Sequence, residues 1–538
     1  MHAVFHLLIT TDWLPEVFLG LAGVLCLVLS PFGLRRGWIY VLAGLGILAA
    51  LMAVVLHTDY LARTPDLFQA FARELILFIG FLLLLSSGGA PVSYDGERVG
   101  TLILAVLGAM FAVRAQDLIV LFVGLELLSL ATYVLLYLDR EGPHRREGAT
   151  KYFYLSILAS AIFLFGVSYL YGLGRSVSYK ALMIAGAEQG FSGPLASIAL
   201  VFILAGLAFK IAAVPFHFYA PDVYQATSHR NAALLSALPK IAGIIVMMRI
   251  ILGFPLTAAP QSWQIVLALS AITMTVGNVL ALWQNHIRRL LAYSSVAHAG
   301  YMLIGLTVAM TYAQPGSHPW DGRTAVLLYL LVYVVATVGA FAALGLLGVQ
   351  GRPVETLEDL RGLARAPAFD ARLIAWAIAA FMFSLAGVPP LAGFWGKLAV
   401  FFSALDVGGS LGNNPAKTRL IILAIVGAIN AAIAAAYYLR VVAVLFFAPE
   451  EEKPQAEIRP ASAAGFFAMA ICLILTVVIG VTPGRWIAHA HSAGASIRQM
   501  VAPTTAVRAL TAVAGPASRS MTPNIRPSHP LVPHDAEK

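Results

Sequence analysis

The sequence predicts an all-α polytopic membrane protein of about 14 transmembrane helices, two of them discontinuous. Of its 538 residues, 60% are hydrophobic and 11% are charged, and the mean hydropathy is +0.83. Soluble domains carry roughly 25% charged residues, so this composition excludes a soluble globular chain. Apolar runs of about 20 residues, the length of helix that crosses a bilayer, follow one another with short polar connections.

These runs define the predicted spans, which lie at 13–30, 37–56, 67–86, 98–114, 117–138, 149–172, 193–226, 228–253, 262–283, 288–310, 324–349, 372–407, 418–447 and 462–482. The segments 193–226 and 372–407 are longer than one crossing needs. Each contains prolines, Pro215 in the first and Pro389 in the second. Because proline removes a backbone donor and clashes with the preceding turn, both segments are predicted to be broken helices.

The two broken spans also indicate an internal repeat. They share a small-Val-Pro core, "AVP" at 213–215 and "GVP" at 387–389, five spans apart. An odd offset inverts topology, so two inverted five-helix repeats are expected, and discontinuous helices at matching places in such repeats are typical of a midplane ion site. The predicted divisions are 1–97 (three helices), 98–253 and 254–447 (the repeats), 448–485 (a last helix) and 486–538 (a peripheral or disordered tail rich in Ala, Pro, Ser and Thr).

Loop charges predict the orientation. Lys and Arg gather in alternate loops, for example Arg35, Arg146, Arg288 and Arg361. Loops rich in these residues stay in the cytoplasm, which places both termini on the outer, periplasmic side, as an even number of spans requires. After this assignment the net charge of +9 leaves no basic patch for nucleic acid.

Several kinds of chemistry are not expected of this chain. Its two cysteines, Cys26 and Cys472, both fall in apolar runs, so no disulfide framework, zinc site or iron–sulfur site can be built from them. No phosphate-binding loop, metal-ligand cluster or nucleophile motif is present in the sequence. Redox chemistry is therefore expected in other proteins.

Four ionisable residues lie well inside predicted spans: Glu126, Lys210, Lys240 and Lys397. Charges at mid-bilayer cost several kcal/mol, so such residues usually face a hydrated interior and carry function. The alternative is structural, with a Glu126–Lys210 ion pair and with Lys240 and Lys397 reaching backbone carbonyls or the membrane interface. A charge pair near 4 Å at an effective dielectric of about 20 is worth about 4 kcal/mol, so a movable carboxylate can load or unload a proton on a buried lysine.

Histidines near these residues are candidate relay groups, because the ordinary pKa of histidine lies close to neutral pH. His217 follows the Pro215 break and His298 lies inside the span 288–310. Simple hydrogen-bonded packing is an equal alternative for both.

At these residues the sequence resembles the antiporter-like membrane subunits of respiratory complex I, most closely the N-subunit group of bacterial NADH–quinone oxidoreductases. The motifs are "VGLELLSLATYVLL", "GLAFKIAAVPFHFYAPDVYQ", "LLSALPKIAG", "RRLLAYSSVAHAGYM" and "LAGVPPLAGFWGK", and the similarity covers about residues 10–485. Lysine rather than glutamate on the twelfth span argues against the M-subunit group. The tail departs from the family pattern.

The resemblance implies a proton relay of Glu126, Lys210, Lys240 and Lys397, with His217 and His298 as further relay groups. It implies no cofactor in this chain, with NADH, FMN, iron–sulfur clusters and quinone in other subunits. The implied partners are an adjacent antiporter-like subunit and small membrane subunits of complex I, in the bacterial inner membrane. Protons would enter from the cytoplasm toward Lys210, pass Lys240 and leave by Lys397.

Three alternative functions remain from the sequence. A subunit of a multi-subunit cation/proton antiporter would share the same spans. A secondary transporter of an organic solute could also use broken helices, although three buried lysines without a polar cluster for a larger ligand disfavour it. A hydrophobic scaffold would hold the complex together without conducting protons.

Overall fold

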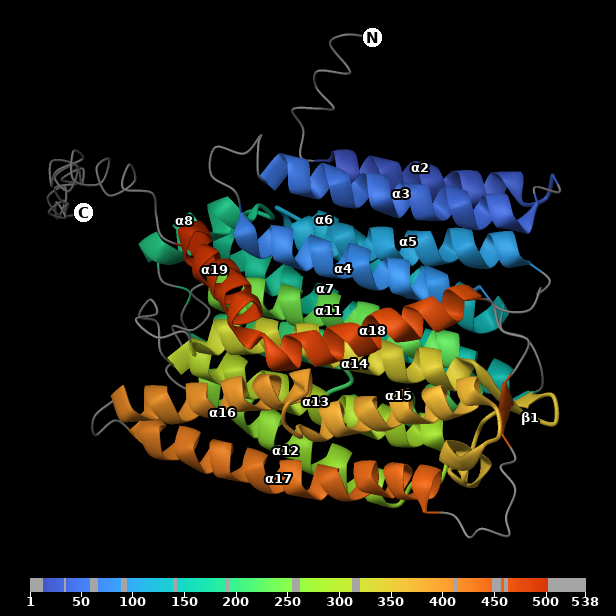
Figure 1. Ribbon diagram of the computed structural model, residues 1–538. Coiled ribbons are helices and arrows are strands. Elements are labelled where there is room, and N and C mark those ends of the chain that lie inside the picture. Colours follow the sequence, from blue (N-terminus) through green and yellow to red (C-terminus); the bar gives the residue numbers. More distant parts are fainter. Residues whose placement is uncertain are drawn as a thin grey trace, which may run out of the picture.

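A computed structural model gives the structure of this chain for residues 13–32, 35–58, 66–88, 94–138, 143–189, 191, 193–253, 262–311, 320–410, 415–447, 456–458 and 463–501. These residues are mostly helical, and the long helices run side by side in one bundle (Figure 1). Twelve of the described helices are long and apolar enough to cross a membrane. Helices α2 (Leu14–Leu29) and α9 (Pro194–Lys210) are apolar but shorter, so the count of 14 spans stays a prediction.

The N-terminal helices lie at one edge of the bundle, where α2 and α3 (Arg36–Leu56) are coloured blue in Figure 1. Helix α4 (Leu67–Ser86) packs against α3 on one side and against the interior helices on the other. The Arg73 guanidinium on α4 forms a 3.1 Å ion pair with the Glu16 carboxylate on α2, and both side chains are buried. This pair joins two charges that would each be costly alone in an apolar environment.

The first half of the bundle follows as α5 (Asp95–Arg114), α6 (Leu118–Leu138), α7 (Pro143–Gly174), α8 (Tyr179–Gln189), α9, α10 (Tyr219–Ala226) and α11 (His229–Gly253). The predicted break in 193–226 is confirmed, because α9 ends at Lys210 and α10 begins at Tyr219. The short helix α8 was not predicted. It connects α7 to the next span.

The second half contains α12 (Ser262–Leu282), α13 (Ile287–Thr311), α14 (Gly322–Gly345), α15 (Phe369–Ala386), α16 (Ala392–Ser410) and α17 (Pro415–Phe446). The break predicted in 372–407 is confirmed between Ala386 and Ala392. The division into two inverted repeats stays a prediction.

The first two helices of each half approach through glycines. A Cβ on Gly124 of α6 would lie 2.4 Å from the Ala112 nitrogen of α5, and one on Gly277 of α12 would lie 2.6 Å from the Ala297 nitrogen of α13. Small residues permit such backbone approach between membrane helices. The same packing device therefore occurs at corresponding places in both halves.

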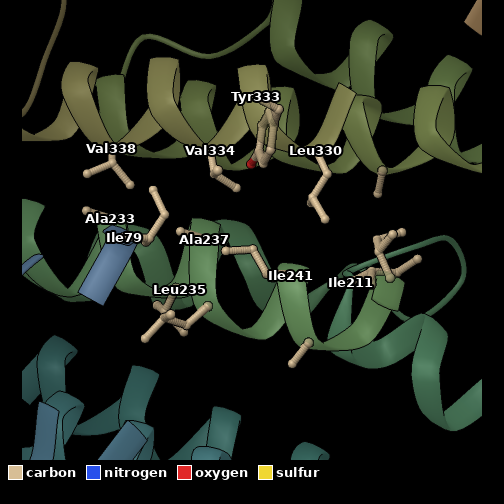
Figure 2. Close-up of a cluster of buried hydrophobic side chains, with 14 of the residues drawn as sticks. Ile79, Ile211, Ala233, Leu235, Ala237, Ile241, Leu330, Tyr333, Val334 and Val338 are labelled. Atoms are coloured by element: carbon tan, nitrogen blue, oxygen red, sulfur yellow. The ribbon is translucent and has the colours of Figure 1, made fainter. Parts of the chain in front are cut away.

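Helices α11 and α14 form the centre of the bundle and are buried along their apolar stretches. Figure 2 shows Ala237 and Ile241 of α11 facing Val334 of α14, with the hydroxyl-bearing Tyr333 among these apolar side chains. A polar side chain in such a core needs a hydrogen-bond partner. Tyr333 marks the position of the functional site.

The predicted all-α class is confirmed, and the structure adds a small sheet that was not predicted. Strands β1 (Leu347–Val349), β2 (Arg352–Pro353) and β3 (Glu457–Ile458) pair antiparallel in the order β2-β1-β3. The predicted span 324–349 was therefore too long, because α14 ends at Gly345 and the chain turns into a strand. The sheet joins the loop after α14 to the segment before α18.

The C-terminal segment also differs from its prediction. Helix α18 (Ala463–Val481) matches the last predicted span, but residues 483–501 form a further helix, α19, which crosses the long helices obliquely (Figure 1). The tail from residue 486 was predicted to be peripheral or disordered; as far as residue 501 it is helical rather than disordered, and the remainder of that tail lies outside the described residues. The missed signal is a face of small residues, Ala490 and Ala493, continued by Ile497, all buried.

Candidate functional site

Lys210 is the last residue of α9, directly before the first helix break. Its Nζ donates hydrogen bonds to Ser129 Oγ on α6 at 2.5 Å and to Ser156 Oγ on α7 at 3.3 Å. The side chain is 7% exposed. The ammonium therefore sits between two hydroxyl groups inside the bundle.

Glu126 lies one turn before Ser129 on α6 and accepts a hydrogen bond from Ser160 Oγ on α7. The predicted direct ion pair is not formed: within the described residues no ion pair joins the Glu126 carboxylate to the Lys210 ammonium. Instead, a cavity with room for about one water molecule is lined by both side chains, together with Ser160 and Leu207. Serine hydroxyls and this cavity separate the two charges.

At the first break, the backbone after Lys210 leaves the regular helical hydrogen-bond pattern. The chain leaves the helix at Ala212, whose φ is +57°, and the Ala213 N–H donates to the Ala208 carbonyl at 2.8 Å. The Val214 N–H donates to Thr273 Oγ1 on α12 at 3.1 Å. A residue from the second half of the bundle therefore holds the break of the first.

Lys240 lies near the middle of the core on α11, and its Nζ donates to the Ser295 carbonyl and, at 2.5 Å, to Ser295 Oγ on α13. The Tyr333 hydroxyl on α14 lies 3.5 Å from Nζ and donates to Ser295 Oγ at 2.8 Å. The ammonium also lies 4.9 Å from the centroid of the Tyr333 ring, a cation–π distance. Pro239, directly before Lys240, removes one backbone donor from α11.

His298 is placed between two tyrosine hydroxyls. Its Nδ1 lies 2.8 Å from the Tyr329 hydroxyl on α14, and its Nε2 lies 2.9 Å from the Tyr438 hydroxyl on α17. Tyr438 forms a further hydrogen bond with Ser294 Oγ. The imidazole centroid lies 4.9 Å from that of Tyr333, so the His298 cluster is in contact with the Lys240 cluster.

Lys397 lies on α16 just after the second break. Its Nζ donates to the Ala386 carbonyl, at the end of α15, at 2.7 Å, and lies 5.3 Å from the centroid of the Tyr301 ring. A Cβ on Gly387, whose φ is +90°, would lie 2.8 Å from Lys397 Cδ. The backbone of the break therefore fits closely around the lysine stem.

An amide pair missed by the sequence interpretation extends this region. Asn278 on α12 donates to the Tyr301 hydroxyl and to Asn430 Oδ1 on α17, both at 3.1 Å. Asn430 donates to Thr275 Oγ1 at 3.1 Å, and the Tyr437 hydroxyl donates to Asn278 Oδ1 at 3.1 Å. Both asparagines are buried within apolar helices. The lysines were predicted as polar residues inside apolar spans, and the same criterion would have indicated these two asparagines.

The predicted site residues fall into two groups. Lys240, on α11 at the end of the first half, lies against the His298 cluster of the second half, which also carries Lys397, whereas Glu126 and Lys210 lie together elsewhere in the first half. The two groups of site residues meet at Gly243 on α11, one turn after Lys240, where a Cβ would lie 3.3 Å from Lys210 Cβ. The Lys210 stem is thus packed against the helix that carries Lys240.

His217 lies in the first break but is not joined to these clusters. Its Nδ1 is buried and has no hydrogen-bond partner among the described residues. His229 contacts the loop after α14, with Nε2 2.9 Å from the Val354 carbonyl. Of the histidines, His298 alone is shown bonded to the tyrosines near the lysines in the described part of the chain.

Two further cations inside apolar helices, Arg249 and Arg440, have structural partners. The Arg249 guanidinium donates to the Val113 carbonyl and lies 4.9 Å from the Tyr179 ring centroid. The Arg440 guanidinium donates to the Leu282 carbonyl at 3.1 Å. These residues join helices and lie outside the lysine clusters.

Residues 115–413 match the family described as NADH:quinone oxidoreductase/Mrp antiporter, TM. Among relatives, the NADH-quinone oxidoreductase subunit N of Rhodospirillum rubrum is 37% identical over 463 residues, which cover 82% of this chain and 89% of the relative. The protein of the same name from Paramagnetospirillum magneticum is 34% identical and covers 89% of this chain and 96% of its own length.

Solved structures are similar as well. A chain of respiratory complex I from Thermus thermophilus is 31% identical, with a TM-score of 0.71 over 88% of this chain and 98% of that one. A chain of the Mrp complex from a Dietzia species, 21% identical, has a TM-score of 0.75 over 92% of this chain and 98% of its own, which is a likeness of fold.

Proposed function

This chain belongs to the N-subunit group of the NADH:quinone oxidoreductase/Mrp antiporter family, and on that premise we propose that its buried lysines carry the protons it translocates. It is an antiporter-like, proton-translocating, multi-pass membrane subunit of respiratory complex I. Its partners are other membrane subunits of that complex. The antiporter-subunit alternative is thereby set aside.

The observation that carries the proposal is the hydroxyl environment of Lys240. If backbone carbonyls were its only partners, the Lys240 ammonium would have no hydroxyl with which to exchange a proton. Lys240 instead contacts the hydroxyls of Ser295 and Tyr333, each of which can accept one proton while it gives up another. A lysine in this setting can exchange a proton with its neighbours.

The relay begins at Glu126 and Lys210. The carboxylate and ammonium line one cavity and are bonded to separate serines, so a small movement of either side chain changes their separation. Their attraction depends inversely on that separation and is strong where water is scarce. Closing the pair holds a proton on Lys210, and opening it favours release toward Lys240.

From Lys240 the route continues through His298 to Lys397. Tyr333 contacts both Lys240 and the His298 ring, and the imidazole is bonded to two further hydroxyls. Histidine can accept a proton on one nitrogen and give one up from the other. The polar groups of Tyr301 and Asn278, beside Lys397, would then form the exit path for the proton. His217 is proposed only as a group near the uptake side.

The chain itself would bind no redox cofactor. NADH, FMN, iron–sulfur clusters and quinone are proposed to act in other subunits, and an adjacent antiporter-like subunit together with small membrane subunits is proposed to transmit the redox step as conformational and electrostatic change. The proposed location is the bacterial inner membrane, with both termini periplasmic. Uptake from the cytoplasm would reach Lys210 first.

Two substitutions at Lys240 test the relay in the assembled complex. Lys240→Met removes the ammonium, whereas Lys240→Arg keeps a cation that does not release its proton in proteins. Both variants are expected to assemble and to lower proton pumping into membrane vesicles at least tenfold per NADH oxidised. Lys417→Met, at the start of α17 and away from the clusters, is the control.

The arginine variant separates the two roles. A fixed structural cation would tolerate arginine, so normal pumping by Lys240→Arg would contradict a proton-carrying lysine. Normal pumping and assembly by both variants would favour the scaffold function instead.

A further inference from the structure

A cavity unrelated to the lysine clusters opens where four helices begin or end. Tyr40 near the start of α3, Ser87 after α4, Arg98 in the first turn of α5 and Arg230 in the first turn of α11 line it. Its enclosed part has room for one or two water-sized groups, and the space that includes the open mouth is about 350 Å³. Among the described residues, those lining it include two arginines and no carboxylate.

Arg98 is the unusual member of this set. It is 7% exposed, and its Nε is buried without a hydrogen-bond partner among the described residues. No hydrogen bond or ion pair of its guanidinium is found in the described part of the chain. A buried cation without a partner is strongly disfavoured, so a ligand that is absent from the chain itself would compensate for it.

Arg230 provides a second guanidinium in the same cavity. It donates to the Ser87 carbonyl at 2.9 Å, which is also the acceptor of the Tyr40 hydroxyl at 2.9 Å. These bonds fix the position of the Arg230 guanidinium relative to the mouth. The first turns of α5 and α11 add the positive ends of two helix dipoles.

We propose that this cavity binds one phosphate anion, carried by the headgroup of an anionic phospholipid. Arginine matches the geometry of phosphate oxygens with paired N–H donors. The lining also contains the apolar side chains of Leu83, Leu102 and Leu234, which would contact the glycerol and first acyl carbons of a lipid. A basic pocket between helix ends, on the side that loop charges predict to be cytoplasmic, fits lipid headgroups.

The test uses the intact complex purified in detergent, washed until its lipid content is constant and then equilibrated with a 3:1 mixture of phosphatidylcholine and phosphatidylglycerol. Phospholipid that remains bound is quantified by mass spectrometry for the natural protein and for Arg98→Gln. Arg372→Gln is the control, because Arg372 also lies in the first turn of a helix, α15, but is exposed.

We expect Arg98→Gln to lose one tightly bound phosphatidylglycerol per complex and Arg372→Gln to lose none. A cryo-electron microscopy map of the natural complex should contain headgroup density against Arg98. Equal lipid content in all three proteins would overturn the proposal, as would a map in which a carboxylate of a neighbouring subunit fills the cavity.

A second arm separates lipid from free phosphate. The same complex, stripped of lipid, is imaged in 50 mM inorganic phosphate as the probe. Compact density without acyl continuation in that sample, together with no density at the cavity in lipid-equilibrated samples, would assign the site to free phosphate and overturn the lipid source.

Discussion

The Lys397 ammonium donates a 2.7 Å hydrogen bond to the carbonyl oxygen of Ala386, the last residue of α15. Carbonyls at a helix C-terminus lack partners within the helix and carry partial negative charge, so a cation there is favourable. Lys397 on α16 is therefore bonded across the helix break to the end of α15. Loss of its proton would weaken this contact, which links the charge of the lysine to the geometry of the break.

Gly387→Ala is expected to disturb Lys397 without removing it. The residue has φ +90°, and an added Cβ would lie 2.8 Å from Lys397 Cδ. Backbone strain alone should cost about 1–2 kcal/mol of stability. Proton pumping per NADH should fall further than it does in a variant that has similar backbone strain but no contact with Lys397.

Gly351→Ala is the matched control for this variant. Gly351 has φ +81°, but nothing lies within 4 Å of an added Cβ. It should lower the thermal stability of the complex while pumping stays normal. Equal pumping by both glycine variants would argue against a role for the fit around Lys397.

Tyr333→Phe tests the hydroxyl that bridges Lys240 and Ser295. The substitution keeps the ring that contacts His298 and removes a 2.8 Å hydrogen bond to Ser295 Oγ. A lost hydrogen bond is worth about 1 kcal/mol, so proton transfer should slow about fivefold. Dye-quenching assays on vesicles measure this rate, with Tyr154→Phe, an exposed tyrosine of α7, as the control. An unchanged rate would place the route elsewhere.

Gly124→Val should prevent close approach of α5 and α6. An added Cβ would lie 2.4 Å from the Ala112 nitrogen, so the helices must separate. Overpacking of this kind costs typically about 1–3 kcal/mol. The yield of assembled complex and its melting temperature should both fall, whereas Gly172→Val on α7, where nothing lies within 4 Å of the Cβ, should change neither. Normal assembly of the Gly124 variant would contradict the packing.

The broken helices could be predicted from the sequence because their cause is local. A proline inside an apolar run too long for one crossing, such as Pro215 in 193–226, predicts a break, and a lysine such as Lys210 inside a span is visible as a charge. The hydroxyl groups around the lysines could not be predicted in the same way. Ser129, Ser156 and Ser295 come from three different helices, and only tertiary packing brings them to an ammonium.

The partners of Glu126 and Lys210 likewise could not be predicted from local sequence. The structural interpretation of the sequence was a direct Glu126–Lys210 ion pair, but Ser160 is bonded to the carboxylate and Ser129 to the ammonium. Helix α19 was missed for another reason. Its buried face is made of small residues such as Ala490, which lack the strong hydropathy of a span but allow close packing.

Asp359 provides a pH-dependent test outside the membrane spans. Burial by itself would raise the pKa of this carboxyl, but paired hydrogen bonds from Arg352, at 2.7 and 3.0 Å, and N–H donors of Thr356 and Glu355 hold its pKa well below the usual range. A carboxyl whose folded pKa is lowered contributes stability above its unfolded pKa of about 3.9, and this contribution is lost as pH falls toward the folded value. The loop after β2 should therefore be stable from pH 8 to about 5 and loosen only in stronger acid.

Asp359→Asn makes this expectation measurable. The amide cannot form the charged pair with Arg352, so the Thr356 and Glu355 N–H groups should exchange with deuterium faster than in the natural protein at pH 7. After correction for intrinsic exchange, the difference should shrink below about pH 4, where the unfolded carboxyl is protonated. Glu358→Gln is the control, because Glu358 forms an exposed pair with Arg361 and should leave protection unchanged. A difference that persists undiminished in acid would mean that the shape of Asp359, rather than its charge, holds the loop.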